Sequence, residues 1–282
     1  MTNATEIDNA PTTMTPTLTI GVLALQGAFV EHIILLEKAA TSLHQSQPQS
    51  QTQEPLPNFT FIQVRTPADL SLCAALILPG GESTSISLIA SRTGLLEPLR
   101  EFVKLSRKPV WGTCAGLILL AESANRSKAT GQELIGGLDV RVQRNYFGRQ
   151  VESFEAELEL PGVVAEGERF HSVFIRAPVV EKVLSSSSVG TEGKEEQVLA
   201  PQMKATSAPV EILGRLPGRA RALRDQTTTA EELGEEGDIV AVRQGNVFGT
   251  AFHPELTGDE RIHAWWLREV VRLTREREKG KA

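Results

Sequence analysis

The chain has 282 residues, of which 40% are hydrophobic, and a formal net charge of −6. That is enough apolar material for one large α/β domain or two small ones. The acidic balance argues against a nucleic-acid-binding protein, because phosphate neutralisation needs clustered Lys and Arg. Two cysteines in a chain of this length do not make a disulfide framework, and they indicate a reducing, cytoplasmic setting. No apolar run approaches the length of a membrane-spanning helix, so no membrane association is expected.

Strands and helices are expected to alternate in the N-terminal half. The Thr-rich segment 1–17 lacks Lys, Arg and an apolar core, so we expect a disordered tail rather than a signal or transit peptide. Helical spacing of Phe29, Ile33 and Leu36 predicts a helix over 28–40, and the Gln-, Pro- and Ser-rich segment 41–58 is expected to be a loop insertion. Apolar runs predict strands at 18–25, 59–64, 74–79 and 109–112, and a helix is expected at 115–122.

The C-terminal half contains the least regular part of the sequence, which is followed by segments with clear strand and helix patterns. Segment 184–237 is expected to be an insertion of loop and disorder with one strand near 210–213. Gly245-Asn246 predicts a hairpin turn, and Thr257 with Glu260 predicts a capping box that opens the last helix. The strands expected here are 153–160, 172–177, 238–244 and 247–252.

This alternation predicts an α/β fold, a single three-layer domain over 18–282 whose mostly parallel central sheet is covered by helices on both faces. Folds of this kind place their sites at the carboxyl ends of strands.

Cys114 lies in the sequence Gly112-Thr-Cys-Ala-Gly116, which has the spacing of a nucleophile elbow with Cys in place of Ser. At such a turn the helix start favours a thiolate, and the N–H of Ala115 can point at a developing oxyanion. A lone Cys is more often a small buried core residue, and Cys73, before an apolar strand, is interpreted in that way. The elbow spacing makes Cys114 the candidate nucleophile.

A nucleophilic Cys needs a His that is oriented by a third group. Of the five histidines, His253 is the best candidate, because it follows an expected strand and is followed by Pro254 and Glu255. An extended segment would point residues i and i+2 the same way, so Glu255 could reach the imidazole. Taken alone the pattern is also typical of a solvated strand end. The other four histidines lack a comparable sequence setting.

Gly80, Gly81 and Glu82 follow an expected strand and precede an expected helix, which Ser83 or Thr84 could cap. Paired glycines let a backbone approach a ligand and aim its N–H groups at it. Both common phosphate-loop patterns are absent, and Glu82 would repel a phosphate. The sequence therefore favours an oxyanion and substrate loop. It contains no cluster with zinc spacing, so no metal or cofactor is expected.

Cys114 in its elbow together with His253-Pro-Glu255 resembles the class I, triad-type glutamine amidotransferases, whose fold is flavodoxin-like. Five blocks extend the resemblance to the family of glutaminase subunits of pyridoxal 5'-phosphate synthase, and they span the chain from about residue 18 to the last helix. The blocks are 21–27, 78–84, 144–151, 174–178 and 252–257. The tail and both insertions exceed the compact pattern of the family, and Trp111 and Tyr146 stand where smaller or different residues are expected.

The resemblance assigns roles residue by residue. It implies a triad of Cys114, His253 and Glu255 that hydrolyses L-glutamine to glutamate and ammonia. The other residues to which it assigns roles are Gly80, Gly81 and Glu82 for the glutamine and oxyanion loop, Arg144, Ile175 and Arg176 for further glutamine contacts, and Gln26 for a position near the partner interface. Arg suits the α-carboxylate of glutamine, and Glu82 suits its α-ammonium.

The resemblance also implies a partner, a (β/α)8-barrel subunit of pyridoxal 5'-phosphate synthase within a large hetero-oligomer. The ammonia must pass directly to such an acceptor, since protonation in water removes its nucleophilicity. Three alternatives remain open from the residues: a glutaminase that serves another ammonia acceptor, a Cys peptidase of similar architecture, and a regulatory subunit that has lost turnover.

Overall fold

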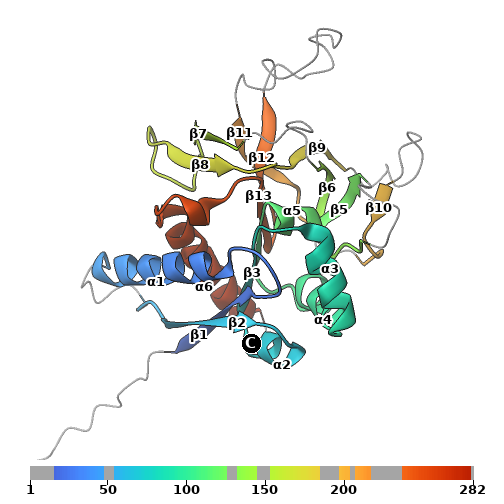
Figure 1. The fold of residues 1–282 in the computed structure, drawn as a ribbon. Coiled ribbons are helices and arrows are strands. Elements are labelled where there is room, and N and C mark those ends of the chain that lie inside the picture. The colour runs from blue at the N-terminus through green and yellow to red at the C-terminus, as the bar shows by residue number, and fades with distance from the viewer. Residues whose placement is uncertain are drawn as a thin grey trace, which may run out of the picture.

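The computed structural model describes residues 16–47, 54–125, 132–144, 153–184, 197–203, 207–216 and 237–280. Nearly all of the predicted tail and most of the predicted insertion at 184–237 lie outside these residues, as does Tyr146. The described residues form an α/β fold around one large sheet, as the sequence predicted (Figure 1).

Five neighbouring strands, in the order β2-β1-β3-β4-β13, run parallel. They are β1 (Thr17–Leu23), β2 (Asn58–Val64), β3 (Ala75–Leu78), β4 (Val110–Thr113) and β13 (Val247–Thr250). Every residue of β3, β4 and β13 is buried, which explains why continuous apolar runs rather than alternation mark them in the sequence. Their carboxyl ends lie at one edge of the sheet.

The rest of the sheet is mixed, because β12 pairs antiparallel with β9, β11 and β13. The strands on this side are β5 (Ala121–Asn125), β6 (Leu138–Gln143), β9 (Val179–Val183), β10 (Gln197–Leu199), β11 (Glu211–Leu216) and β12 (Asp238–Gln244). A separate antiparallel pair consists of β7 (Phe154–Leu158) and β8 (Phe170–Phe174). The predicted hairpin at 245–246 and the strand near 210–213 are both confirmed, whereas β5, β6, β9 and β10 were not predicted.

Helices cover the sheet on two sides (Figure 1). On one side α1 (Phe29–Gln45) packs against α6 (Arg261–Lys279), and on the other lie α3 (Ser83–Arg92), α4 (Leu96–Arg100) and the π-helical turn η1 (Glu101–Leu105). Two short helices complete the set, α2 (Pro67–Leu72) and α5 (Ala115–Leu120). Within the described ranges, none of these helices has the length and apolar character needed to cross a bilayer.

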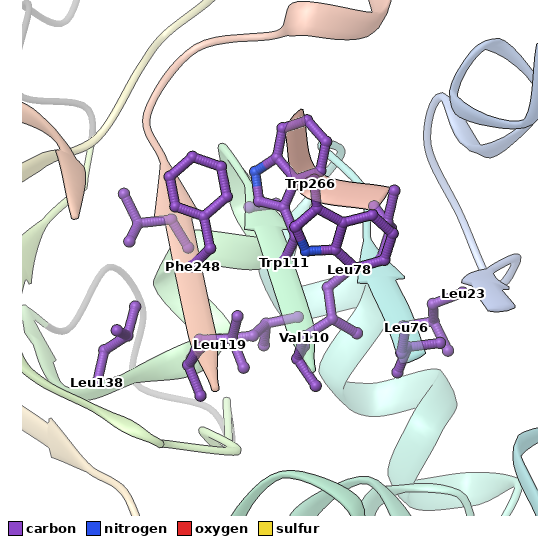
Figure 2. Close-up of a cluster of buried hydrophobic side chains, with 14 of the residues drawn as sticks. Leu23, Leu76, Leu78, Val110, Trp111, Leu119, Leu138, Phe248 and Trp266 are labelled. Atoms are coloured by element: carbon purple, nitrogen blue, oxygen red, sulfur yellow. The ribbon is translucent and has the colours of Figure 1, made fainter. Parts of the chain in front are cut away.

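Trp111 is fully buried at the centre of the core between the sheet and α6 (Figure 2). Its ring packs against Trp266 at 5.8 Å and Phe248 at 5.3 Å, and its indole N–H donates to Thr250 Oγ1 at 3.1 Å. A buried indole needs such a partner. Trp111 therefore supports the sheet beneath the site instead of shaping a substrate pocket.

Three predicted boundaries are wrong for identifiable reasons. The first helix continues to Gln45, because Leu43 extends its buried stripe into the segment predicted as a loop. The helix predicted at 115–122 ends at Leu120, and the chain enters β5 directly. The cap of α3 is Glu82 rather than Ser83 or Thr84, since its carboxylate accepts from two N–H groups of the first turn.

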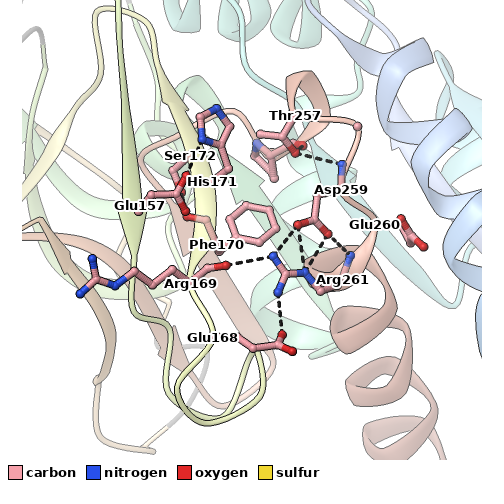
Figure 3. A network of polar contacts seen from close by, with 12 residues as sticks. Glu157, Glu168, Arg169, Phe170, His171, Ser172, Thr257, Asp259, Glu260 and Arg261 are labelled. Atoms are coloured by element: carbon pink, nitrogen blue, oxygen red, sulfur yellow. Dashed lines mark hydrogen bonds and ion pairs between the residues drawn. The ribbon is translucent and has the colours of Figure 1, made fainter.

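The capping box predicted at 257–260 is also wrong, because the N-cap residue of α6 is Glu260, which makes no side-chain cap, and the N–H of Arg261 donates to Asp259 Oδ1 at 2.9 Å. Thr257 Oγ1 instead accepts from the N–H of Asp259, and Asp259 pairs with the guanidinium of Arg261 at 2.7 Å (Figure 3). Arg261 also contacts Glu168 at 2.6 Å and the carbonyl of Arg169 at 2.9 Å. These contacts tie the start of α6 to the β7–β8 hairpin.

Candidate active site

The carboxyl ends of β4 and β13 bring two distant segments of the chain together. Thr113 is in register with Thr250, and the N–H of Cys114 donates to the Thr250 carbonyl at 2.8 Å. Cys114 is the first residue beyond β4, and His253 follows β13. The register of one parallel strand pair therefore sets the thiol and the imidazole at the same edge of the sheet.

Cys114 stands at a strained turn between β4 and α5, with φ 47° and ψ −99°. A non-glycine residue at positive φ costs on the order of 1–3 kcal/mol, and such strain is concentrated at functional sites. The turn needs glycine at position 116, because a Cβ there would lie 2.0 Å from the Leu78 carbonyl oxygen. The side chain of Cys114 remains 6% exposed. The predicted elbow geometry is present.

His253 and Glu255 form a buried pair, with His253 Nδ1 2.8 Å from Glu255 Oε1. The Cys114 side chain interacts with His253 and acts to raise the pKa of the imidazole. The sequence explanation for the pair is only partly right, because Glu255 lies in a 3-10 turn, η3 (Pro254–Leu256), rather than in an extended segment. The N–H of His253 donates to Val173 O of β8 at 2.8 Å, which fixes the segment against the hairpin.

Charge and hydrogen bonding decide the protonation of this pair. Burial alone would lower the pKa of His253, but hydrogen bonds and charge from Cys114 and Glu255 outweigh burial and raise the pKa to about 10. Burial acts to raise the pKa of Glu255, but its electrostatic interaction with His32 and its hydrogen bond and charge interaction with His253 overcome that effect and lower the pKa. His253 is therefore an imidazolium facing a carboxylate at neutral pH.

The glycine loop lies directly beside the base. A Cβ at Gly80 would fall 2.3 Å from His253 Cε1, so this position tolerates no side chain. Gln26 follows β1 and accepts from the N–H of Glu82 through Oε1 at 2.7 Å. The structure thus places Gln26, Gly80 and Gly81 beside the His253 imidazole at this edge of the sheet.

Glu82 and Arg144 lie near each other at the start of α3. Both carboxylate oxygens of Glu82 accept from the helix start, from Thr84 N at 3.0 Å and Ser85 N at 2.7 Å. Burial lowers the pKa of Arg144 to about 10, against the opposing charge of Glu82. The Arg144 guanidinium donates to Gln132, a buried residue that the sequence did not identify. Glu82 is therefore a helix cap as well as a candidate substrate ligand.

Ile175 and Arg176 form the turn after β8. The Ile175 carbonyl lies 3.9 Å from Cys114 Sγ, and Arg176 adopts φ 45° with an exposed side chain. The structure therefore brings the main chain of Ile175 to the thiol. Among the described residues there is no group of His, Cys, Asp and Glu that could hold a metal ion.

Two histidines that lacked a suggestive sequence setting lie directly behind the triad. His32 of α1 and His263 of α6 are fully buried, and His32 Nε2 lies 3.3 Å from Glu255 Oε2. The signal that could have found His32 is its place on the buried stripe of α1, four residues before Leu36.

Comparison with known proteins agrees with this geometry. The sequence profile described as the SNO glutamine amidotransferase family matches residues 22–210 and 210–272. The probable pyridoxal 5'-phosphate synthase subunit PDX2 of Arabidopsis thaliana is 40% identical over 269 residues, 93% of this chain and 88% of the relative. The pyridoxal 5'-phosphate synthase subunit PdxT of Streptomyces griseus is 42% identical over 259 residues, 92% of this chain and 98% of the relative. A crystal structure of a glutamine amidotransferase superposes with TM-score 0.59 at 34% identity, covering 89% of this chain and 98% of the other.

Gly116→Ala is expected to destabilise the fold by about 1–3 kcal/mol or more, because the new methyl group meets the backbone of β3 rather than a side chain that could move. The matched control is Gly280→Ala, where the new Cβ would be 3.5 Å from its nearest neighbour. Denaturant unfolding measures both variants. Equal stability of the two variants would contradict the packing argument for the elbow.

The imidazole of His253 is expected to titrate near pH 10 and to titrate at lower pH in Glu255→Gln, because the amide removes a negative charge that favours the imidazolium. By linkage, the stability that this raised pKa contributes is fully present below pH 6.5 and is lost as the pH rises through about 10. NMR titration of isotope-labelled histidine measures the shift, and the exposed His44 serves as the internal reference. An unchanged His253 titration in Glu255→Gln would refute the assignment.

Proposed function

Since the chain belongs to the SNO glutamine amidotransferase family, we propose that it is the glutaminase subunit of a pyridoxal 5'-phosphate synthase and supplies ammonia for vitamin B6 synthesis. The observation that carries the proposal is the strained Cys114 at a helix start, held at the same sheet edge as an imidazole that a buried carboxylate orients. Relatives at about 40% identity that bear the synthase name match nearly the whole chain, which favours this acceptor over other ammonia-consuming enzymes.

The chemistry begins with attack of the Cys114 sulfur on the side-chain amide carbon of glutamine, which forms a C–S bond. The oxyanion is held by the N–H groups of Gly81 and Ala115, the latter being the first residue of α5. The imidazolium of His253 gives its proton to the amide nitrogen as the C–N bond breaks, and ammonia leaves. Water, deprotonated by the now neutral His253, then cleaves the γ-glutamyl thioester and releases glutamate.

Charged groups around the thiol and the imidazole would orient the glutamine substrate. Arg144 is the candidate partner of the glutamine α-carboxylate, and the exposed Arg176 together with the Ile175 main chain provides further contacts. Glu82 would bind the α-ammonium with the same carboxylate that caps α3. A cap that is already ordered costs little further entropy when the ligand binds.

The ammonia is passed to a separate synthase subunit, which we propose to be a (β/α)8 barrel within a large hetero-oligomer. Gln26 connects the loop after β1 to the glycine loop through its bond to Glu82 N. A partner that contacts the first loop would therefore act on the oxyanion loop, and glutaminase activity is expected to rise when the partner docks.

Cys114→Ala is expected to lower glutamate release by roughly three orders of magnitude or more, because the variant has no nucleophile. Cys73→Ala is the matched control, since that thiol is buried in the core and burial raises its pKa to about 11. Activity is measured with and without the synthase partner. Glutamine hydrolysis that survives Cys114→Ala would eliminate the thioester mechanism.

The acceptor is tested with amide-¹⁵N-glutamine, ribose 5-phosphate, glyceraldehyde 3-phosphate and the barrel subunit. We expect ¹⁵N in pyridoxal 5'-phosphate with wild-type protein, and none with Cys114→Ala unless ¹⁵N-ammonium is added. Glutaminase activity without label transfer would favour another acceptor. Peptide cleavage without glutaminase activity would favour a Cys peptidase, and binding to the barrel subunit without turnover would favour a regulatory subunit.

A further inference from the structure

A line of buried polar side chains continues from the triad into the core. Glu255 presents Oε1 to His253, and its other oxygen, Oε2, is buried without a well-aligned hydrogen bond to any described residue. The nitrogen facing that oxygen is His32 Nε2, at 3.3 Å. His32 Nδ1 lies 3.0 Å from His263 Nε2, which belongs to a helix 231 residues further along the chain. Both additional histidines are fully buried.

The acceptor character of the carboxylate determines the tautomer of His32. A carboxylate can only accept, so a lone pair on His32 Nε2 at 3.3 Å would repel Glu255, whereas an N–H is attracted to it. That N–H is shared with Thr113 Oγ1 at 3.2 Å, in the last residue of β4. His32 Nδ1 is then an acceptor, and His263 Nε2 is the donor.

The far end of the line gives the same answer independently. His263 Nδ1 is buried and has no hydrogen-bond partner among the described residues. With the proton on Nε2, the unpaired atom is a lone pair; with the proton on Nδ1, it would be an orphaned N–H, the rarer and costlier case in proteins. Both ends therefore assign one direction of donation, from His263 to His32 and from His32 towards Glu255.

The charged and titratable groups around His32 are few. Glu255 and His253 face it from the triad segment, His263 from α6, and Glu31 from its own helix. Burial, the strongest influence, lowers the pKa of His32, although Glu255 opposes the effect. Burial likewise lowers the pKa of His263. Both imidazoles are therefore neutral dipoles at neutral pH, and Trp111 packs edge-on against His32 at 5.7 Å.

We propose that His32 is a positioning residue for the catalytic centre, holding Glu255 from behind so that its Oε1 faces His253, with His263 fixing the His32 tautomer. This inference rests on the proposed function and assigns a role to a side chain that touches neither substrate nor thiol. A neutral donor suits this task, because it stabilises the carboxylate charge without neutralising the charge that His253 requires.

The first test compares His32→Leu with wild type in glutamine hydrolysis by the complete complex. We expect kcat to fall about 10–100-fold, the usual effect of losing an outer-shell partner, with little change in KM for glutamine. His32→Gln, whose amide N–H₂ can reach Glu255 and Thr113, is expected to recover most of the loss. His44→Leu, on the exposed side of the same helix, is the matched control and should retain full activity.

The second test needs no glutamine and separates positioning from general damage. His32→Leu is expected to lower the pKa of His253 measured by NMR. In a Glu255→Gln background the same substitution should leave the pKa of His253 at the value measured for Glu255→Gln alone. Wild-type kcat and an unshifted His253 in His32→Leu would overturn the inference. So would a further shift in the double variant, or failure of His32→Gln to recover activity. An inactive wild-type complex with the expected NMR shifts would overturn the proposed function and leave the positioning role standing.

Discussion

The parallel pairing of β4 with β13 is the constraint on which the candidate site depends. It joins Val110–Thr113 to Val247–Thr250 residue by residue, and it delivers Cys114 and the His253 segment to the same edge. The Cys114 N–H bond to Thr250 O extends this ladder into the turn itself. A one-residue shift in the pairing register would turn every side chain of a strand to the opposite face of the sheet. Because every residue of β4 and β13 is buried, such a shift would also disrupt the core. The packing of the fold and the alignment of thiol with imidazole are therefore enforced by the same contacts.

Much of this edge could be predicted from sequence, because its signals are local. The apolar runs of β1, β3 and β4, the glycine spacing around Cys114 and the hairpin at 245–246 each report a short-range requirement of the backbone. The predicted helix starts were wrong where several side chains can accept from the same N–H groups. Glu82, not Ser83, caps α3, and Thr257 accepts a hydrogen bond within its loop instead of capping α6. Glu255 contacts the imidazole from a 3-10 turn, which the residue pattern around it did not predict.

The polar line behind the triad was beyond sequence reasoning for a different reason. His32 and His263 each lie on an apolar helix stripe, where a single His is most often an ordinary core residue. Only the packing of α1 against α6 brings them within 3.0 Å, across 231 residues of chain. A buried polar group is costly unless it has a partner. A two-histidine line ending on a buried carboxylate is therefore better explained as support for that carboxylate than as core packing.

The two walls of the site are held by different kinds of contact, and this difference bears on how the site can respond to a partner. The wall formed by Ile175 is fixed to the base through the main-chain bond between His253 N and Val173 O. Arg261 ties the same hairpin to α6 through an ion pair with Glu168 and a hydrogen bond to Arg169 O (Figure 3). The other wall, the Gly80–Gly81 loop, is joined to the loop after β1 by a side-chain bond in which the N–H of Glu82 donates to Gln26 Oε1. Glycines place few limits on the backbone, so this wall is the one whose conformation a single contact can change. We propose that a docking subunit acts through this loop, because the base and its carboxylate are held on the other side of the site by main-chain and buried contacts.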